Sequence, residues 1–181
     1  MRSPLHLNTP DREPDFVLQP RKTRFVKLLV YGLAPASLVM LFLVLLTAPL
    51  DLSVFARLLL FYGIPPVWHE PLHYLSYRLM GIPARLNCIR TWLPKDVATF
   101  PASMTAVAAA PIIANAALCA GAALFMPFPP LAAVTALFYV VSLHASDLAV
   151  IRHCLRLIFS RAAVSDDGSS FRVWITSAAD H

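Results

Sequence analysis

Four long apolar runs constrain this chain more than any other feature of its sequence. They cover residues 25–48, 54–80, 98–126 and 131–159. Each run is long enough to cross a bilayer, which takes roughly 20 apolar residues in a helix. The chain is 58% hydrophobic with a mean hydropathy of +0.65, above the roughly 45–50% apolar share of soluble domains. We therefore predict an all-α membrane protein with four transmembrane helices and only short cytoplasmic β-like segments.

The basic residues predict how these four runs are oriented, because Lys and Arg near span ends stay on the cytoplasmic side. All 15 except Arg57 lie before or at the start of the first run, from the end of run two to the loop before run three, or near and beyond the end of run four. We therefore expect both termini to be cytoplasmic and the protein to be a multi-pass protein of the cell membrane. This distribution also explains the net charge of +5 without nucleic acid as a partner.

The same reading divides the chain into three parts. Residues 1–24 form a polar cytoplasmic tail, residues 25–161 form the four-span domain, and residues 162–181 form a short cytoplasmic C-terminal tail. The N-terminal tail is too long and too mixed in charge for the first part of a signal peptide, so we expect the first run to be a retained anchor. The segment "ARLNCIRTWL" could form a short strand or hairpin, and "SDDGSSFRVWI" reads as a turn followed by a strand.

The motif "HEPLH" lies in the second run and is the clearest indication of a functional site in the sequence. In H-E-x-x-H two histidines one helical turn apart bind one zinc ion, and the glutamate acts as general base. His69 and His73 are thus the expected metal ligands and Glu70 the expected catalytic base. The alternative is that these polar groups only bond neighbouring helices. That alternative must account for a glutamate inside a span, which costs roughly 2.5–3.5 kcal/mol on insertion scales.

A hydrolytic zinc site usually needs a third protein ligand, and the fourth run supplies an aspartate in "SLHASDLAVIRHC". In the predicted topology runs two and four are parallel. His73 lies five residues before Arg78, and Asp147 lies five residues before Arg152, so both sit about 7–8 Å above a basic residue at the interface. We therefore favour Asp147 as the third ligand. His144, one turn earlier, is either an alternative ligand or a supporting or substrate-facing group.

Two further residues in the runs are notable. Asn115, the most polar residue of the third run, could bind the substrate backbone or the oxyanion, although a hydrogen bond between helices is the commoner use. Pro71 lies inside HEPLH, with Pro65 and Pro66 just before it. Because proline removes a helical hydrogen bond, we expect the second run to be bent or broken before Trp68.

An HExxH motif on one transmembrane helix with an aspartate on a later one resembles the site-2 protease type of intramembrane zinc metallopeptidase. The small size, "AAAPIIANAAL" in the third run and "SD" in the fourth are most similar to the bacterial zincin peptidase family. The resemblance covers roughly residues 62–175. It implies a Zn²⁺ enzyme with His69, His73 and Asp147 as ligands and Glu70 as base. Asp147 departs from the site-2 protease pattern, since Leu148 follows it in place of glycine.

The sequence thus predicts a zinc metalloprotease that hydrolyses peptide bonds of membrane-protein or peptide substrates, with the lipid bilayer as its other partner. Two alternatives stay open. The same His, Glu and Asp residues could form a proton or metal-ion transport path, since such residues inside membranes also serve pumps. A catalytically inactive scaffold could also keep zinc for structure. Neither the substrate nor the oligomeric state follows from the sequence.

Overall fold

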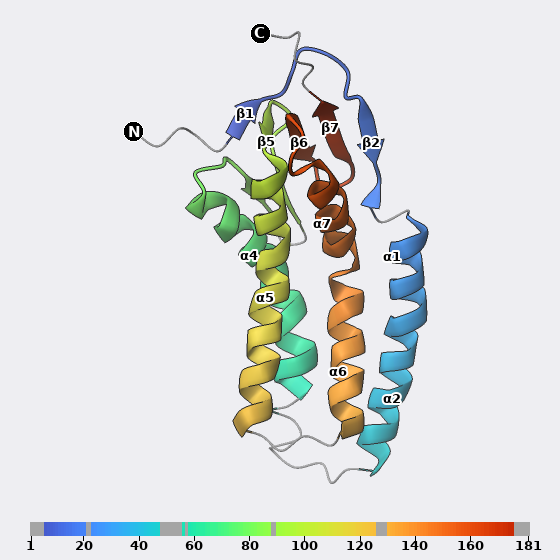
Figure 1. The fold of residues 1–181 in the computed structure, drawn as a ribbon. Coiled ribbons are helices and arrows are strands. Elements are labelled where there is room, and N and C mark those ends of the chain that lie inside the picture. Colours follow the sequence, from blue (N-terminus) through green and yellow to red (C-terminus); the bar gives the residue numbers. More distant parts are fainter. Residues whose placement is uncertain are drawn as a thin grey trace.

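The computed structural model describes residues 6–20, 23–47, 56, 58–87, 90–125 and 130–175. The helical elements are α1 (Arg24–Leu28), η2 (Leu29–Leu33), α2 (Ala34–Thr47), η3 (Leu59–Gly63), α4 (Ile64–Leu79), α5 (Pro101–Phe125), α6 (Pro130–Leu143) and α7 (Ala145–Leu157); η2 and η3 are π-helical turns. The strands are β1 (His6–Asn8), β2 (Phe16–Leu18), β3 (Arg85–Leu86), β4 (Thr91–Trp92), β5 (Val97–Thr99), β6 (Ala162–Asp166) and β7 (Phe171–Ile175). The helices run side by side, and a sheet lies across one end of them (Figure 1).

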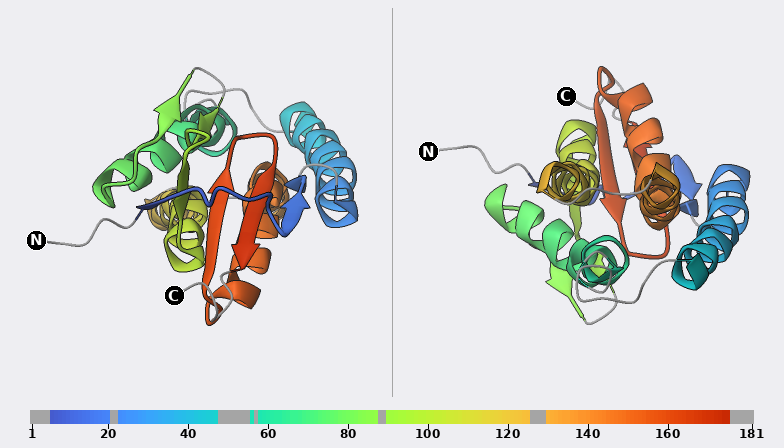
Figure 2. Two further views of the ribbon diagram at one scale, coloured as in Figure 1. Left: turned by 90° about the horizontal axis from the view of Figure 1, so that it is seen from above. Right: turned by 90° about the horizontal axis from the view of Figure 1, so that it is seen from below.

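The sheet has five antiparallel strands in the order β1-β5-β6-β7-β2. Its two edge strands both come from the N-terminal segment, since His6 pairs with Thr99 and Phe16 pairs with Val173. The segment crosses the sheet between these two edges, as the view from above shows (Figure 2). Beside this sheet, β3 and β4 form a separate antiparallel hairpin, as the sequence suggested.

The prediction of an all-α protein with four spans is wrong. The structure is mixed α/β, and the described residues contain two helical segments long and apolar enough to cross a membrane, Val26–Leu43 and Pro101–Gly121. A third candidate span arises only if Val134–Leu143 and Ala145–Leu157, which meet at an angle of 62°, count as one bent span. Residues 1–24 and 162–181, expected to be tails, supply four of the five strands.

The second predicted span is not among the described segments apolar enough to cross a membrane. Helix α4 directly continues the π-helical turn η3, and the two have 16 and 5 residues, so length does not exclude a span. Its polar side chains are the physical reason, because α4 carries His69, Glu70, His73 and Arg78. In place of the break expected before Trp68, the structure has the π-helical turn η3, which leads directly into α4, and α4 continues through Pro71. The ends predicted at residues 48, 54 and 126 lie outside the described residues.

The main buried cluster joins the sheet to the helices that carry the motif. It includes Tyr77 of α4, Met104 and Val107 of α5, Cys154 of α7, and Phe171 of β7. Because burial of apolar side chains is the dominant stabilising term in folding, this cluster fixes α4, α5 and α7 relative to the sheet. The far helical ends expose apolar side chains instead, such as Leu38, Phe42 and Leu46 of α2.

Candidate metal centre

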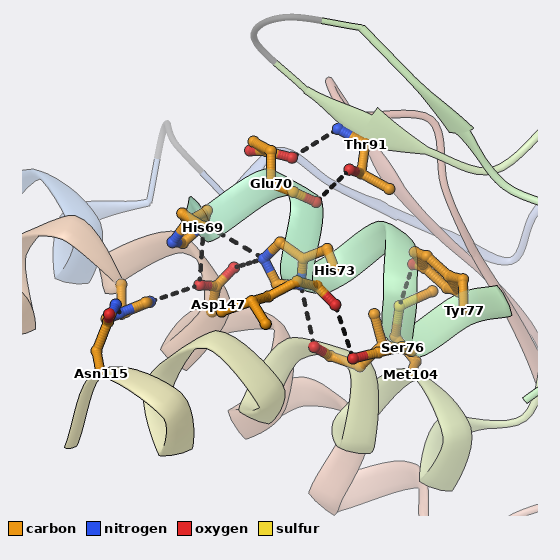
Figure 3. Close-up of polar contacts among 12 residues, drawn as sticks. His69, Glu70, His73, Ser76, Tyr77, Thr91, Met104, Asn115 and Asp147 are labelled. Carbon is orange, nitrogen blue, oxygen red and sulfur yellow. Dashed lines mark hydrogen bonds and ion pairs between the residues drawn. The ribbon is translucent and has the colours of Figure 1, made fainter. Parts of the chain in front are cut away.

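His69 and His73 lie one turn apart on the buried face of α4, with 8% and 9% of their surface exposed. Asp147, in the first turn of α7, reaches both of them. Its Oδ1 is 3.2 Å from Nε2 of His73, and its Oδ2 is 3.4 Å from Nε2 of His69. The two Nε2 atoms are 3.3 Å apart. The three side chains therefore point at one another and enclose a common centre (Figure 3).

This group could bind a metal ion. His69, His73 and Asp147 are all buried, and one ligand atom from each lies within 4.8 Å of the others. Two histidines on α4 and an aspartate on α7 converge because both helices pack against α5. The sequence analysis placed His73 and Asp147 at the same depth, from their spacing to Arg78 and Arg152, and in the fold these two side chains are in contact.

Glu70 lies beside this group, and its carboxylate is held by the β3–β4 hairpin. The backbone N–H of Thr91 donates to Oε2 of Glu70 over 2.6 Å. The Thr91 hydroxyl also donates to the carbonyl of Glu70 over 2.7 Å. Strand β4 therefore fixes both the backbone and the side chain of the glutamate in HEPLH, on the side of α4 that faces the hairpin (Figure 3).

His144 stands at the bend between α6 and α7 and is 1% exposed. Its Nδ1 lies 3.1 Å from Oδ2 of Asp147, and its Nε2 lies 2.7 Å from the amide nitrogen of Asn115. Asn115, fully buried on α5, also accepts a hydrogen bond of 2.6 Å from the indole N–H of Trp68. His144 and Asn115, for which the sequence left alternative roles open, thus belong to one network of hydrogen bonds between helices. This network ends at the carboxylate of Asp147.

A cavity of about 260 Å³ opens on this group. The helices contribute His69, Glu70, His73, Tyr77 and Asp147 to its wall, and the sheet side contributes Arg90, Thr91, Asp166, Gly168 and Ser169. The hairpin and the β6–β7 turn are joined over it, since Arg90 donates to the carbonyl of Gly168 and Leu93 donates to that of Asp166. The cavity wall is therefore shared between the helices and the strand connections.

Asp166 is a residue of this wall that sequence reasoning missed. Burial raises the pKa of its carboxyl to about 6, although the N–H of Gly168 donates to it over 2.8 Å. The sequence pattern "SDDGSS" predicted a turn, but nothing in it placed that turn next to HEPLH. Only the pairing of β6 with β5 and β7, which depends on distant segments, brings Asp166 to the cavity.

Comparison of the chain with protein-family models, with curated proteins and with solved structures gave no match in any of the three.

Proposed function

We propose that this protein is a membrane-embedded zinc metallopeptidase that cleaves peptide or membrane-protein substrates at the His69, His73 and Asp147 site. The observation that carries the proposal is the convergence of two histidine nitrogens and one carboxylate in a buried group. Two ligands 2.0–2.1 Å from a tetrahedral zinc ion lie about 3.3–3.4 Å from one another, and the Nε2 atoms of His69 and His73 are 3.3 Å apart. Asp147 presents one carboxylate oxygen to each of them, Oδ1 to His73 over 3.2 Å and Oδ2 to His69 over 3.4 Å. Two imidazoles and one carboxylate are also a donor set found in catalytic zinc sites.

The remaining groups of the cavity support hydrolysis rather than a closed structural metal site. When bound, zinc would supply a Lewis acid and lower the pKa of a water molecule. Glu70 lies on the wall of the same cavity, and we assign it as the base that takes a proton from water and passes it to the leaving amine. The Thr91 N–H donates to Oε2, so we assign Oε1 as the Glu70 atom that takes the proton from water.

We further propose that the protein lies in the cell membrane and that its sheet lies on the cytoplasmic side. Two helical segments, Val26–Leu43 and Pro101–Gly121, are long and apolar enough to span a bilayer. In the described part of the chain, the basic residues belong to the strands, to their connections or to the first turn or last two turns of helices that adjoin them in sequence. The preference of Lys and Arg for the cytoplasmic side therefore supports this orientation.

The test compares metal content and proteolysis in Glu70→Gln and wild type. Gln keeps the size of Glu70 and can still accept from Thr91, but it cannot act as the base. We expect about one zinc per chain in both proteins and a loss of at least 100-fold in cleavage of a membrane-inserted peptide library, the lower range for removing a general base. Mass spectrometry of the products measures cleavage, and metal analysis of the purified protein measures zinc.

Glu13→Gln is the matched control, because Glu13 is the other glutamate of the chain and lies exposed in the N-terminal segment. It should cleave as fast as wild type. Cleavage by Glu70→Gln at the wild-type rate would remove Glu70 as the base. If no variant cleaves and ion flux across vesicles depends on Glu70 and Asp147, the site belongs to a transporter.

A further inference from the structure

Helix α5 carries three buried residues at intervals of four: Val107, Pro111 and Asn115. In an α-helix the N–H of residue 111 would donate to the carbonyl of residue 107. Proline has no N–H, so Pro111 leaves the Val107 carbonyl without that helical bond. The carbonyl instead lies 3.0 Å from Nδ1 of His73. A proline within α5 thus makes a backbone acceptor available to a residue of HEPLH.

This contact fixes where the proton of His73 sits. A carbonyl oxygen can only accept, so Nδ1 of His73 carries the hydrogen. In the neutral ring Nε2 then holds the lone pair, and Nε2 is the atom that faces His69 and Asp147. A metal-binding histidine needs this arrangement, since the ring nitrogen that does not bind the metal usually donates to a carbonyl or carboxylate.

A second chain of contacts fixes His144 in the same way, and it begins at a group that can only donate. The indole N–H of Trp68 has no acceptor capacity, so the Asn115 atom 2.6 Å from it must be the amide oxygen. The Asn115 NH₂ group then faces Nε2 of His144 over 2.7 Å and donates to it. The hydrogen of the neutral His144 ring must therefore be on Nδ1, which lies 3.1 Å from Oδ2 of Asp147.

We propose that α5 sets the proton positions of the metal centre, through the Val107 carbonyl released by Pro111 and through the Asn115 amide oriented by Trp68. In this role Pro111, Asn115 and Trp68 are positioning residues. They hold His73 with its metal-binding nitrogen unprotonated, and they keep a hydrogen-bond donor of His144 on Asp147. The inference deepens the proposed function because it concerns the same metal centre, but it makes no use of peptide cleavage.

The first arm of the test reads the proton position directly. Full-length protein labelled with ¹⁵N in histidine is measured by NMR at about pH 8.5, above the ordinary imidazole pKa of about 6.5, and the His144 signals are assigned with His144→Gln. Wild type should show His144 with Nδ1 protonated and Nε2 unprotonated. Asn115→Asp replaces the donor with an acceptor, so Nε2 should become protonated. A protonated Nε2 in wild type, or an unchanged spectrum in Asn115→Asp, overturns the proposal.

Trp68→Phe keeps the test decisive if Asn115→Asp does not fold. Loss of the indole N–H lets the Asn115 amide turn over, so both tautomers of His144 should be present. A single, wild-type tautomer in Trp68→Phe would show that Trp68 does not orient the amide and would equally overturn the proposal.

The second arm measures zinc affinity by competition with a chromogenic chelator. Asn115→Asp should weaken zinc binding 10–100-fold, because His144 would then lose the Nδ1 hydrogen that it donates to the ligand Asp147. Pro111→Ala restores an N–H that competes for the Val107 carbonyl. It should weaken binding up to about tenfold while the thermal unfolding midpoint stays the same or rises, because proline inside a helix is unfavourable. A merely structural role of Pro111 would not lower affinity while keeping stability.

Tyr62→Phe is the control, since it removes a comparable interhelical hydrogen bond, from the Tyr62 hydroxyl to Thr135 over 2.9 Å, that does not lead to the metal centre. Its zinc affinity should equal that of wild type. Affinities of Asn115→Asp and Pro111→Ala within twofold of wild type would overturn the proposal. If neither wild type nor any variant cleaves peptides, the proposed function is wrong, but the NMR and zinc-affinity measurements still test this proposal.

Discussion

Asp147 makes contacts with three histidines through its two carboxylate oxygens. Oδ1 faces His73, and Oδ2 faces both His69 and His144. A carboxylate that is 8% exposed would be costly to bury without partners, and these contacts explain how the chain accommodates an acid in an otherwise apolar segment. In the described part of the chain, Asp147 is the acid that completes a possible metal group with HEPLH.

The contacts of His144 predict that it supports the metal centre without binding the metal itself. Both ring nitrogens of His144 are engaged by other residues, whereas Asp147 points between the two HEPLH histidines. Asp147→Ala should therefore lose most of the zinc. His144→Ala should keep about one zinc per chain and weaken its affinity 10–100-fold. Metal analysis after dialysis against a weak chelator measures both. Zinc lost in His144→Ala and kept in Asp147→Ala would make this a three-histidine site.

The residues of the centre were largely predictable, because a motif with fixed spacing needs only local helix geometry. His69 and His73 follow from the i, i+4 spacing on a helix. Asp147 was chosen by comparing its depth with that of His73, with Arg78 and Arg152 as markers of the interface. The fold places Asp147 beside both histidines, but the four-span topology behind that comparison is wrong. The proton positions were not predictable. They depend on Trp68 and Val107, whose relevance rests on contacts between helices that no local pattern encodes.

The bend between α6 and α7 was not predicted from the sequence. Residues 131–159 read as one span, but the two helices meet at 62°. Neither proline nor glycine stands at the bend, so the usual sequence marks of a kink are absent. The bend coincides with His144, whose side chain bonds Asn115 of α5 and Asp147 of α7. Tertiary contacts of this kind, rather than backbone preference, account for the geometry.

The β6–β7 turn is held by two adjacent aspartates with opposite electrostatic situations. Burial opposes the charge on Asp167, but Ser169 and Ser170 donate to its carboxylate from their hydroxyl and backbone groups and lower its pKa to about 2. Asp166 faces the cavity, and burial raises its pKa to about 6. Gly168 completes the turn with a positive φ of 80°, a conformation that glycine adopts without strain.

This contrast predicts two pH effects of opposite sign on the free energy of unfolding. The ordinary pKa of the carboxyl is 3.8. Because the folded pKa of Asp166 is higher, the folded state holds a proton that the unfolded state releases, and stability should fall by up to about 3 kcal/mol as pH rises from about 4 to about 6. Because the folded pKa of Asp167 is lower, its contribution is present above about pH 4 and is lost as pH falls toward 2.

Two matched variants separate these effects. Asp166→Asn can still accept from the N–H of Gly168, so it should flatten the fall between pH 4 and 6 and leave the acid limb unchanged. Asp167→Asn should lower stability above pH 4 and leave the fall near pH 5 in place. Denaturant unfolding in detergent across this pH range measures both. A fall near pH 5 that persists in Asp166→Asn would assign it to another group.

At the scale of the whole molecule, the sheet joins three segments that lie far apart in the chain. Strands β1 and β2 come from residues 6–18, β5 follows the hairpin at residue 97, and β6 and β7 lie in residues 162–175. Each edge strand has three residues, too few for an alternating pattern to be recognised. The sequence therefore indicated tails where the fold has a sheet, because strand pairing is a long-range property.

The sheet also sharpens the topology that the basic residues predict. All its strands and the β3–β4 hairpin lie at one end of the helices, while α2 and α5 both end at the other (Figure 1). Val26–Leu43 and Pro101–Gly121 both run away from the sheet, and η3–α4 and α6–α7 bring the chain back to it. A membrane crossed by these helices therefore leaves every strand on one side. We expect this side to be cytoplasmic, because Arg85, Arg90 and Lys95 belong to the hairpin and to the connection that follows it.

Cysteine labelling in intact cells tests this arrangement. The three native cysteines are first replaced by serine, and single cysteines are then introduced at Asn8, Lys95, Thr47 or Phe125. A membrane-impermeant maleimide should label Thr47→Cys and Phe125→Cys, at the far ends of α2 and α5, and should label Asn8→Cys and Lys95→Cys only after the cells are opened. Labelling of Lys95→Cys in intact cells would put the hairpin outside, and the cavity beside Glu70 would then open away from the cytoplasm. Labelling of Asn8→Cys but not of Lys95→Cys would contradict the pairing of β1 with β5, since the two strands could not then belong to one sheet.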